Sequence, residues 1–136
     1  MTIPPRIFAS LEAEDWIQRL REMYGPLMFH QSGGCCDGSA PMCFRRHEFR
    51  VGAQDVLLGT LLEETPVWIG AAQFEYWRHT QIMIDVVPGR GAGMSLEAPL
   101  GIRFIIRSRV FTDEEVAALE AAGDPIRGDA CDERWS

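Results

Sequence analysis

The segment Ile102–Phe111, with the sequence IRFIIRSRVF, is the longest strand candidate in the chain. One face of an extended backbone would carry the arginines Arg103, Arg107 and Arg109. The opposite face would be largely apolar, with Ile102, Phe104, Ile106 and Val110. Alternation of this kind predicts a strand with one face on a core and the other in water. We therefore expect the fold to be organised around β-sheet.

Shorter strands are predicted before this segment. Gln81–Val87 (QIMIDVV) is a strand candidate with Asp85 set inside it, and a glycine-containing crossing at 88–93 then leads to Met94–Glu97. Nearer the N-terminus, we predict strands at Leu27–Gln31, Glu48–Val51, Asp55–Leu62 and Val67–Gly70. Pro66 indicates a sheet edge or a strand start, because proline cannot donate to a strand ladder. Short strands at close intervals favour a β-rich core.

Helices are predicted near both ends of the chain and once between the strands. Ser10 is placed to cap a helix in which apolar residues recur at helical spacing, and Gly25 ends that helix. A two-turn helix is predicted at Ala71–Arg78. Thr112–Glu115 has the pattern of a capping box for a last helix, which ends at Gly123.

The chain length predicts one domain. With 136 residues, 46% of them hydrophobic, the chain can bury a core without cross-links. We expect a single α+β domain over residues 1–136, with an irregular lead-in at 1–9 and a loose tail at 124–136 that contains Cys131. Neither an apolar run of about 18 residues nor a secretory signal pattern is apparent, so we expect a protein of the reducing cytoplasm, without membrane association.

The charge pattern excludes several function classes. The net charge of −7 disfavours sequence-independent binding to nucleic acid or to anionic membranes. All 13 basic residues are arginines, so no lysine exists to form a Schiff base or to complete a phosphate-binding loop.

The stretch Gln31–Cys43, QSGGCCDGSAPMC, contains three of the four cysteines of the chain. Adjacent cysteines in an extended backbone point to opposite sides, so Cys35 and Cys36 can face one ion only where the chain turns sharply. The glycines at 33, 34 and 38 permit such a turn. Cys43 would then return a third sulfur to the same point. This Cys-Cys-x6-Cys pattern is neither a paired C-x-x-C zinc motif nor a ferredoxin run.

We predict that these thiolates hold a metal ion or an iron–sulfur cluster, because soft sulfur ligands select zinc, copper(I), iron or iron–sulfur centres. The predicted ligands are Cys35, Cys36 and Cys43, with His30 as first-choice nitrogen ligand and His79 as a further candidate. His47, Met42 and Asp37 are other donors nearby. The metal could be zinc, iron or copper.

Two other functions stay open. In a thiol-dependent enzyme, Cys35 would act as nucleophile or redox thiol, with His30 as its base and Cys36 as the resolving thiol. In an interaction module, the aromatic group Phe74, Tyr76 and Trp77 would contact a partner protein. A single free cysteine is more often a small buried hydrophobe. The sequence leaves open whether the chain forms a homo-oligomer.

Charged residues outside this segment have structural explanations. Asp85 is a candidate ligand or base, although the favoured interpretation is a carboxylate that accepts hydrogen bonds from backbone or arginine donors. The arginine pair Arg45-Arg46 and the arginine face of the last strand could bind an anion, but in an acidic protein such charges usually pair internally.

Most of the chain resembles an uncharacterised bacterial family, the domain of unknown function 779, whose genes often neighbour those of aldehyde dehydrogenases. The matching pieces are GPLMFHQSGGCCDGSAPMC (25–43), EFRVGAQDVLLG (48–59), QFEYWRHTQIMIDVVPGRG (73–91) and RSRVFTDEE (107–115). The resemblance implies an association with aldehyde oxidation and an aldehyde dehydrogenase as partner.

A remote resemblance connects GGCCDG (33–38), VWIG (67–70), MIDVVPGRG (83–91) and MSLEAP (94–99) with the A-type iron–sulfur carriers of the HesB-like fold. It implies a β-sandwich or pseudobarrel with an N-terminal and a C-terminal helix, and it matches Cys35 to the first cluster cysteine. The later cysteine pair of the carriers has no counterpart here. The combined prediction is an accessory protein that binds a metal or a cluster and supports aldehyde oxidation. This prediction is favoured over an enzyme.

Overall fold

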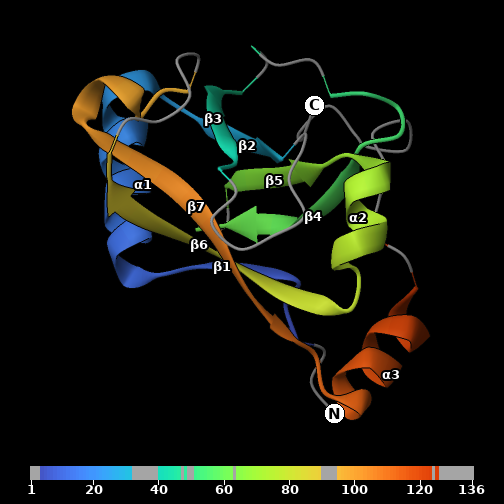
Figure 1. Cartoon of the computed structure of the whole chain (residues 1–136). Coiled ribbons are helices and arrows are strands. Elements are labelled where there is room, and N and C mark those ends of the chain that lie inside the picture. The colour runs from blue at the N-terminus through green and yellow to red at the C-terminus, as the bar shows by residue number, and fades with distance from the viewer. Residues whose placement is uncertain are drawn as a thin grey trace.

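The structure is a computed structural model that describes residues 4–31, 40–46, 48, 51–62, 64–89, 95–123 and 125 (Figure 1). Strands and helices alternate irregularly along these ranges. In chain order the elements are β1 (Ile7–Ala9), α1 (Leu11–Tyr24), β2 (Leu27–Gln31), β3 (Met42–Arg45), β4 (Val56–Leu61), β5 (Thr65–Ile69), α2 (Ala71–Trp77), β6 (Thr80–Pro88), a 3-10 turn η1 (Ala98–Leu100), β7 (Ile102–Val110) and α3 (Asp113–Ala122).

The described strands form two separate sheets. The first has the order β1-β6-β7, in which β1 runs parallel to β6 and β7 runs antiparallel to it. The second has the order β3-β2-β5-β4, in which β2 and β5 are parallel and both edge strands are antiparallel to their neighbours. Within the described ranges the sheets do not close into a barrel, so the fold is a mixed α+β domain with two sheets.

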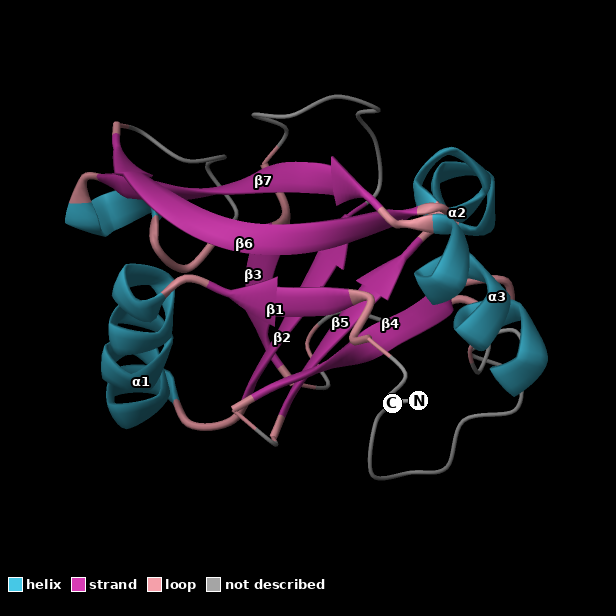
Figure 2. Cartoon of the chain, turned by 90° about the horizontal axis from the view of Figure 1, so that it is seen from below, coloured by secondary structure: helices cyan, strands magenta, loops and turns pink. Residues whose placement is uncertain are grey.

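The main hydrophobic core lies between the two sheets. Phe29 of β2 meets Phe104 of β7 edge to face, with ring centroids 5.1 Å apart. Where β1 crosses β4, a Cβ on Gly59 would lie 2.8 Å from the Cγ2 of Ile7, so only glycine permits this approach. Figure 2 shows α1 beside one end of the sheets and α2 and α3 beside the other.

Helix α1 begins and ends where the sequence predicts. The Ser10 hydroxyl accepts a hydrogen bond from the Ala13 backbone N–H at 3.1 Å and donates one to Asp85 at 2.8 Å. The same serine therefore caps the helix and ties it to β6. Gly25, with φ of +85°, ends the helix in a conformation that favours glycine.

Several other predicted elements are confirmed. Strands β2, β4, β5, β6 and β7, the short helix α2 and the capped helix α3 all form within about two residues of the predicted bounds. The capping box of α3 is complete, because the Thr112 side chain accepts from the Glu115 N–H and the Glu115 side chain accepts from the Thr112 N–H. No helix in the described part of the chain combines the length and the apolar character needed to cross a membrane.

Other predictions about the elements are wrong. The lead-in 1–9 contains β1, which is a strand only because it pairs with β6 far away in the sequence. Met42–Arg45 is a strand through its pairing with β2, whereas the predicted strand at 48–51 is absent at its described residues, Glu48 and Val51. The strand start predicted at Pro66 is confirmed, because Pro66 is the second residue of β5, which is an interior strand.

Candidate functional site

The β2–β3 hairpin holds both ends of the cysteine segment. His30 pairs with Met42 across the two antiparallel strands, so the segment leaves and re-enters the sheet at neighbouring positions. Cys35 and Cys36 lie outside the described residues, as do His47 and Cys131. Convergence of the predicted thiolates therefore stays a prediction.

The hairpin register separates two of the predicted ligands. Directly paired residues of antiparallel strands point to the same face of a sheet, and successive residues point to opposite faces. Phe29 pairs with Cys43, and Phe29 faces the core between the sheets. His30 pairs with Met42 and therefore lies on the outer face. The structure does not bring His30 and Cys43 together, because the sheet itself lies between their side chains.

His30 instead has a carboxylate beside it on the outer face. Its Nε2 atom lies 3.1 Å from the Oδ1 atom of Asp55, and both side chains are largely buried. The other carboxylate oxygen of Asp55 accepts a hydrogen bond of 2.7 Å from the Gly52 N–H, which fixes the orientation of the carboxylate. The sequence predicts Asp55 only as the first residue of a strand. An aspartate three residues after glycine, just before a strand, was the available signal for a turn that holds a carboxylate.

The outer face near His30 also contains sulfur and indole groups. Met28 lies two residues before His30 on the same face, and Met42 is the cross-strand neighbour of His30. On the other side, Trp68 of β5 is paired with His30. Trp68 is fully buried, and its indole N–H has no hydrogen-bond partner among the described residues. Neither Met28 nor Trp68 belongs to the core cluster between the sheets.

Cys43 is part of the inner face and of a buried polar network. Its backbone N–H donates a hydrogen bond of 2.8 Å to the Ser95 hydroxyl, which in turn donates to the Glu97 carboxylate. Glu97 also accepts a hydrogen bond of 3.2 Å from the Phe104 N–H, so the network joins the two sheets. Burial raises the pKa of the Cys43 thiol well above its ordinary value, and the negative charge of Glu97 adds to the effect. Cys43 thus lies in the core between the sheets, on the face opposite His30.

His79 lies in different surroundings from His30. It follows α2 and borders a small hollow with Arg6, Arg78 and residues of α3. The structure therefore does not unite His79 with the hairpin. Among the described residues, no three His, Cys, Asp or Glu side chains are grouped closely enough to hold a metal ion.

The predicted aromatic contact patch is reduced to one residue. Phe74 and Trp77 are buried, whereas Tyr76 is 71% exposed. Two of the three rings therefore belong to the interior and are not available to a partner.

Asp85 has the structural role that the sequence favoured. Its carboxylate accepts hydrogen bonds from Arg107 Nε at 2.7 Å, from the Ser10 hydroxyl, and from the Val86 N–H. The hydrogen bond from Arg107 is the main reason why the pKa of Asp85 is lowered. On the same face, Arg109 makes a two-pronged ion pair with Glu115 at 2.9 Å. Arg107 and Arg109 of this arginine face thus pair internally, as expected for an acidic protein.

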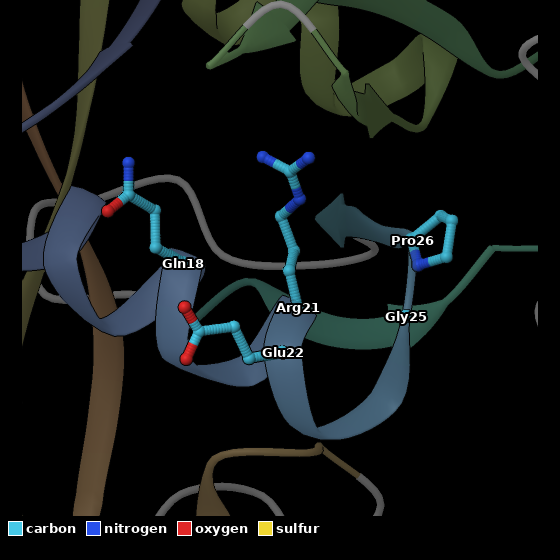
Figure 3. A pocket seen from close by; sticks show the side chains of 5 residues that line it. All are labelled: Gln18, Arg21, Glu22, Gly25 and Pro26. Atoms are coloured by element: carbon cyan, nitrogen blue, oxygen red, sulfur yellow. The ribbon is translucent and has the colours of Figure 1, made fainter.

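A hollow of about 350 Å³ lies elsewhere, where α1 ends and β2 begins (Figure 3). It is lined by Gln18, Arg21, Glu22, Gly25 and Pro26. Arg21 forms an ion pair with Glu64. His30 is near the opposite end of β2, so this hollow and the His30 environment are separate features.

Comparison with protein families yields one match. The model of a family described as a domain of unknown function (DUF779) matches residues 16–110. No curated protein and no solved structure matches the chain. The matched region extends from α1 to the end of β7 and so includes both sheets except β1.

Proposed function

We propose that this chain, which belongs to the DUF779 family of domains of unknown function, is a binding protein for a metal ion or an iron–sulfur centre. The centre would lie at the open end of the β2–β3 hairpin. Its ligands would be the thiolates of Cys35 and Cys36 and the imidazole of His30. The observation that carries the proposal is the buried contact between Asp55, just before β4, and His30 of β2, the strand that leads into these cysteines.

A carboxylate beside an imidazole is the usual companion of a histidine ligand. Histidines that bind metals commonly place their second ring nitrogen against a carboxylate, which fixes the ring and makes it a better donor. The Asp55 carboxylate lies 3.1 Å from Nε2 of His30, close enough to supply such a companion, and the Gly52 N–H holds the carboxylate in place. Burial of both side chains also keeps the ring in one orientation.

The donor set fits a single ion better than a cluster. Clusters are usually held by four cysteine thiolates, and Cys43 does not fit as one of them because it is buried on the opposite face with a raised pKa. His79 does not fit this centre either, because it borders a hollow beside α3. Two thiolates and one imidazole are a donor set suited to zinc, iron or copper.

The wider role that we propose is that of an accessory protein in the cytoplasm, which supports aldehyde oxidation beside an aldehyde dehydrogenase. This part is based on the resemblance of the sequence pieces 25–43, 48–59, 73–91 and 107–115 to the family whose genes neighbour such enzymes. We further propose a relation to the HesB-like fold. It is based on the order of GGCCDG, VWIG and MIDVVPGRG, and an experimental structure superposed on a carrier would test it.

A thiol-dependent enzyme is the second candidate, and Asp55 favours it as well. A nucleophilic cysteine needs a base, and the base is oriented by a third group. Cys35, His30 and Asp55 would supply these three roles in that order. The two candidates differ in whether the thiolate is held by a metal or remains reactive.

Elemental analysis of the protein purified without oxygen tests the main proposal. We expect about one metal equivalent per chain, lost in a Cys35→Ser/Cys36→Ser variant and reduced in His30→Gln. Cys43→Ala and His79→Gln are the matched controls and should retain the metal. A metal-free wild-type protein whose Cys35 reacts much faster with iodoacetamide than a denatured cysteine would overturn metal binding and support the enzyme.

Co-purification tests the proposed partner separately. A tagged copy of the chain, expressed in cells that contain the neighbouring aldehyde dehydrogenase, should retain that enzyme on an affinity column. If the enzyme is retained equally by the Cys35→Ser/Cys36→Ser variant, the association does not depend on the metal. If it is never retained, the partner proposal is wrong.

A further inference from the structure

We infer that the outer face of the β3-β2-β5 strands is a binding site for copper(I), with the thioethers of Met28 and Met42 and the imidazole of His30 as ligands. The inference goes beyond the proposed function, because its donors are two thioethers instead of the thiolates of Cys35 and Cys36, and the two sites share only His30. It uses described residues alone. We call these three side chains, together with Trp68 and Asp55, the outer-face cluster.

The sheet register places the three donors together. His30 and Met42 are directly paired across antiparallel strands, where Cβ atoms are about 4.5–5.5 Å apart. Met28 lies two residues from His30 along β2 and therefore on the same face. Met28 is also the diagonal neighbour of Met42. The methionine side chain has three rotatable bonds, so both sulfurs can turn toward the imidazole.

The chemistry of these donors selects the metal. Thioether sulfur is a soft, neutral ligand, and soft sulfur ligands favour copper(I). Zinc in proteins is held by cysteine, histidine and carboxylate ligands. A set of two thioethers and one imidazole therefore discriminates for copper(I) and against zinc. A thioether also needs no deprotonation, so binding does not require a thiolate in this buried place.

Trp68 and Asp55 supply the surroundings that a buried cation needs. Trp68 is paired with His30 on the side away from Met42 and is fully buried. Tryptophan is the aromatic side chain that attracts cations best. The Asp55 carboxylate, 3.1 Å from the His30 ring, supplies a negative charge that offsets the cost of burying a positive one.

Ordinary hydrophobic packing is the competing explanation. Met28 and Trp68 are as buried as core residues, but neither is part of the core cluster between the sheets. The interior side of the same strands carries the apolar residues Phe29, Val67 and Ile69 together with the buried polar residues Gln31 and Thr65. A histidine and its carboxylate partner would be a costly addition to a layer whose only task is packing. Met42 and Asp55 are only partly buried, so the cluster borders the surface on their side.

Methyl NMR with copper(I) as the probe tests the inference. The chain has six methionines, and labelling their ε-methyl groups with ¹³C gives one signal each. One equivalent of copper(I), supplied without oxygen as its acetonitrile complex, should shift the Met28 and Met42 signals and leave the Met23 and Met83 signals in place. Zinc should shift neither pair. Equal shifts of all methionine signals, or none, would overturn the inference.

Affinity measurements with a competing copper(I) chelator complete the test. Met42→Leu and Met28→Leu conserve volume and should each weaken copper(I) binding by at least about tenfold, the lower end of what loss of a supporting group costs at metal sites. Met83→Leu, on the other sheet, is the matched control and should bind as the wild type does.

The same measurements in the Cys35→Ser/Cys36→Ser variant separate this inference from the proposed function. If that variant still binds copper(I) through the two methionines, the outer-face cluster is correct and the thiolate centre is wrong. If metal is lost with the cysteines while both methionine variants bind copper(I) at wild-type strength, the thiolate centre survives and the copper(I) inference is wrong.

Discussion

Phe29 and His30 are neighbours in β2 and are both buried, with 0% and 5% of their surfaces exposed, yet they belong to different environments. Phe29 faces the other sheet and packs against Phe104. His30 faces outward, where Asp55, Met42 and Trp68 surround it. The comparison teaches that burial alone does not identify core. In this sheet the inner face provides stability, and the outer face gathers donors.

The largest expected effect contrasts these two faces. Phe29→Ala should lower the free energy of unfolding by about 3–5 kcal/mol, because it leaves a cavity against Phe104. Met42→Leu on the outer face should cost less than about 1.5 kcal/mol, since it conserves volume. Urea denaturation of both variants measures the difference. Equal losses would show that the two faces contribute alike to stability and would remove the distinction.

A second test concerns Cys43 on the inner face. Cys43→Ala should lower the free energy of unfolding by roughly 1–2 kcal/mol, because a fully buried sulfur is replaced by a smaller side chain. In the wild type, Cys43 should resist iodoacetamide at pH 8, since burial raises its pKa. Peptide mapping after alkylation detects this, with the denatured protein as the fully labelled reference. Rapid labelling of native Cys43 would place it outside the core.

A third test uses the buried carboxylate between the sheets. Burial raises the pKa of Glu97 above 4.5, so the folded state holds this proton more tightly than the unfolded state. The stabilisation that Glu97 adds to the free energy of unfolding is fully present below pH 4.5 and is lost as the pH rises through the pKa of the folded state. Compared with Glu97→Gln, the wild type should therefore be relatively most stable at acid pH and lose that advantage toward neutrality. A constant difference across pH, from thermal unfolding, would contradict the raised pKa.

The smallest effect belongs to Asp85, which is partly exposed on the outer face of the other sheet. The hydrogen bond from Arg107 lowers the pKa of Asp85 below 3.8, so its contribution is present above that pH and is lost as the pH falls through the folded value. Asp85→Asn should be less stable than the wild type at neutral pH and equal to it in strong acid. The sign is opposite to that of Glu97. If the stability differences of Glu97→Gln and Asp85→Asn from the wild type changed with pH in the same direction, one of the two pKa shifts would be wrong.

Elements with a complete local signal were predicted from the sequence. The Ser10 and Thr112 caps, the terminating glycines, and the alternation of β7 each reside in a few consecutive residues. β1 and β3 were missed for the opposite reason. Each is short, and each is a strand because a distant or returning segment pairs with it.

The residues of the candidate site also differ in how far the sequence could predict them. The sequence identified His30 and ranked it first among nitrogen ligands, because it stands at the end of a predicted strand next to the cysteines. It did not identify Asp55, which meets His30 only after β4 joins the sheet through β5. It also grouped Cys43 with His30, since nearness along the chain carries no information about which face of a hairpin a side chain will occupy.

The amino-acid sequence was sufficient to predict the helix ends, most strands and an acidic α+β chain, with a cysteine-rich segment directly after the strand at 27–31. The face of the sheet on which His30 and Cys43 lie, and the position of Asp55 beside His30, could be read only from the tertiary structure. The physical reason is that caps and periodicity act over one or two turns, whereas register is set by pairing between distant strands. A shift of one residue in that pairing exchanges the two faces.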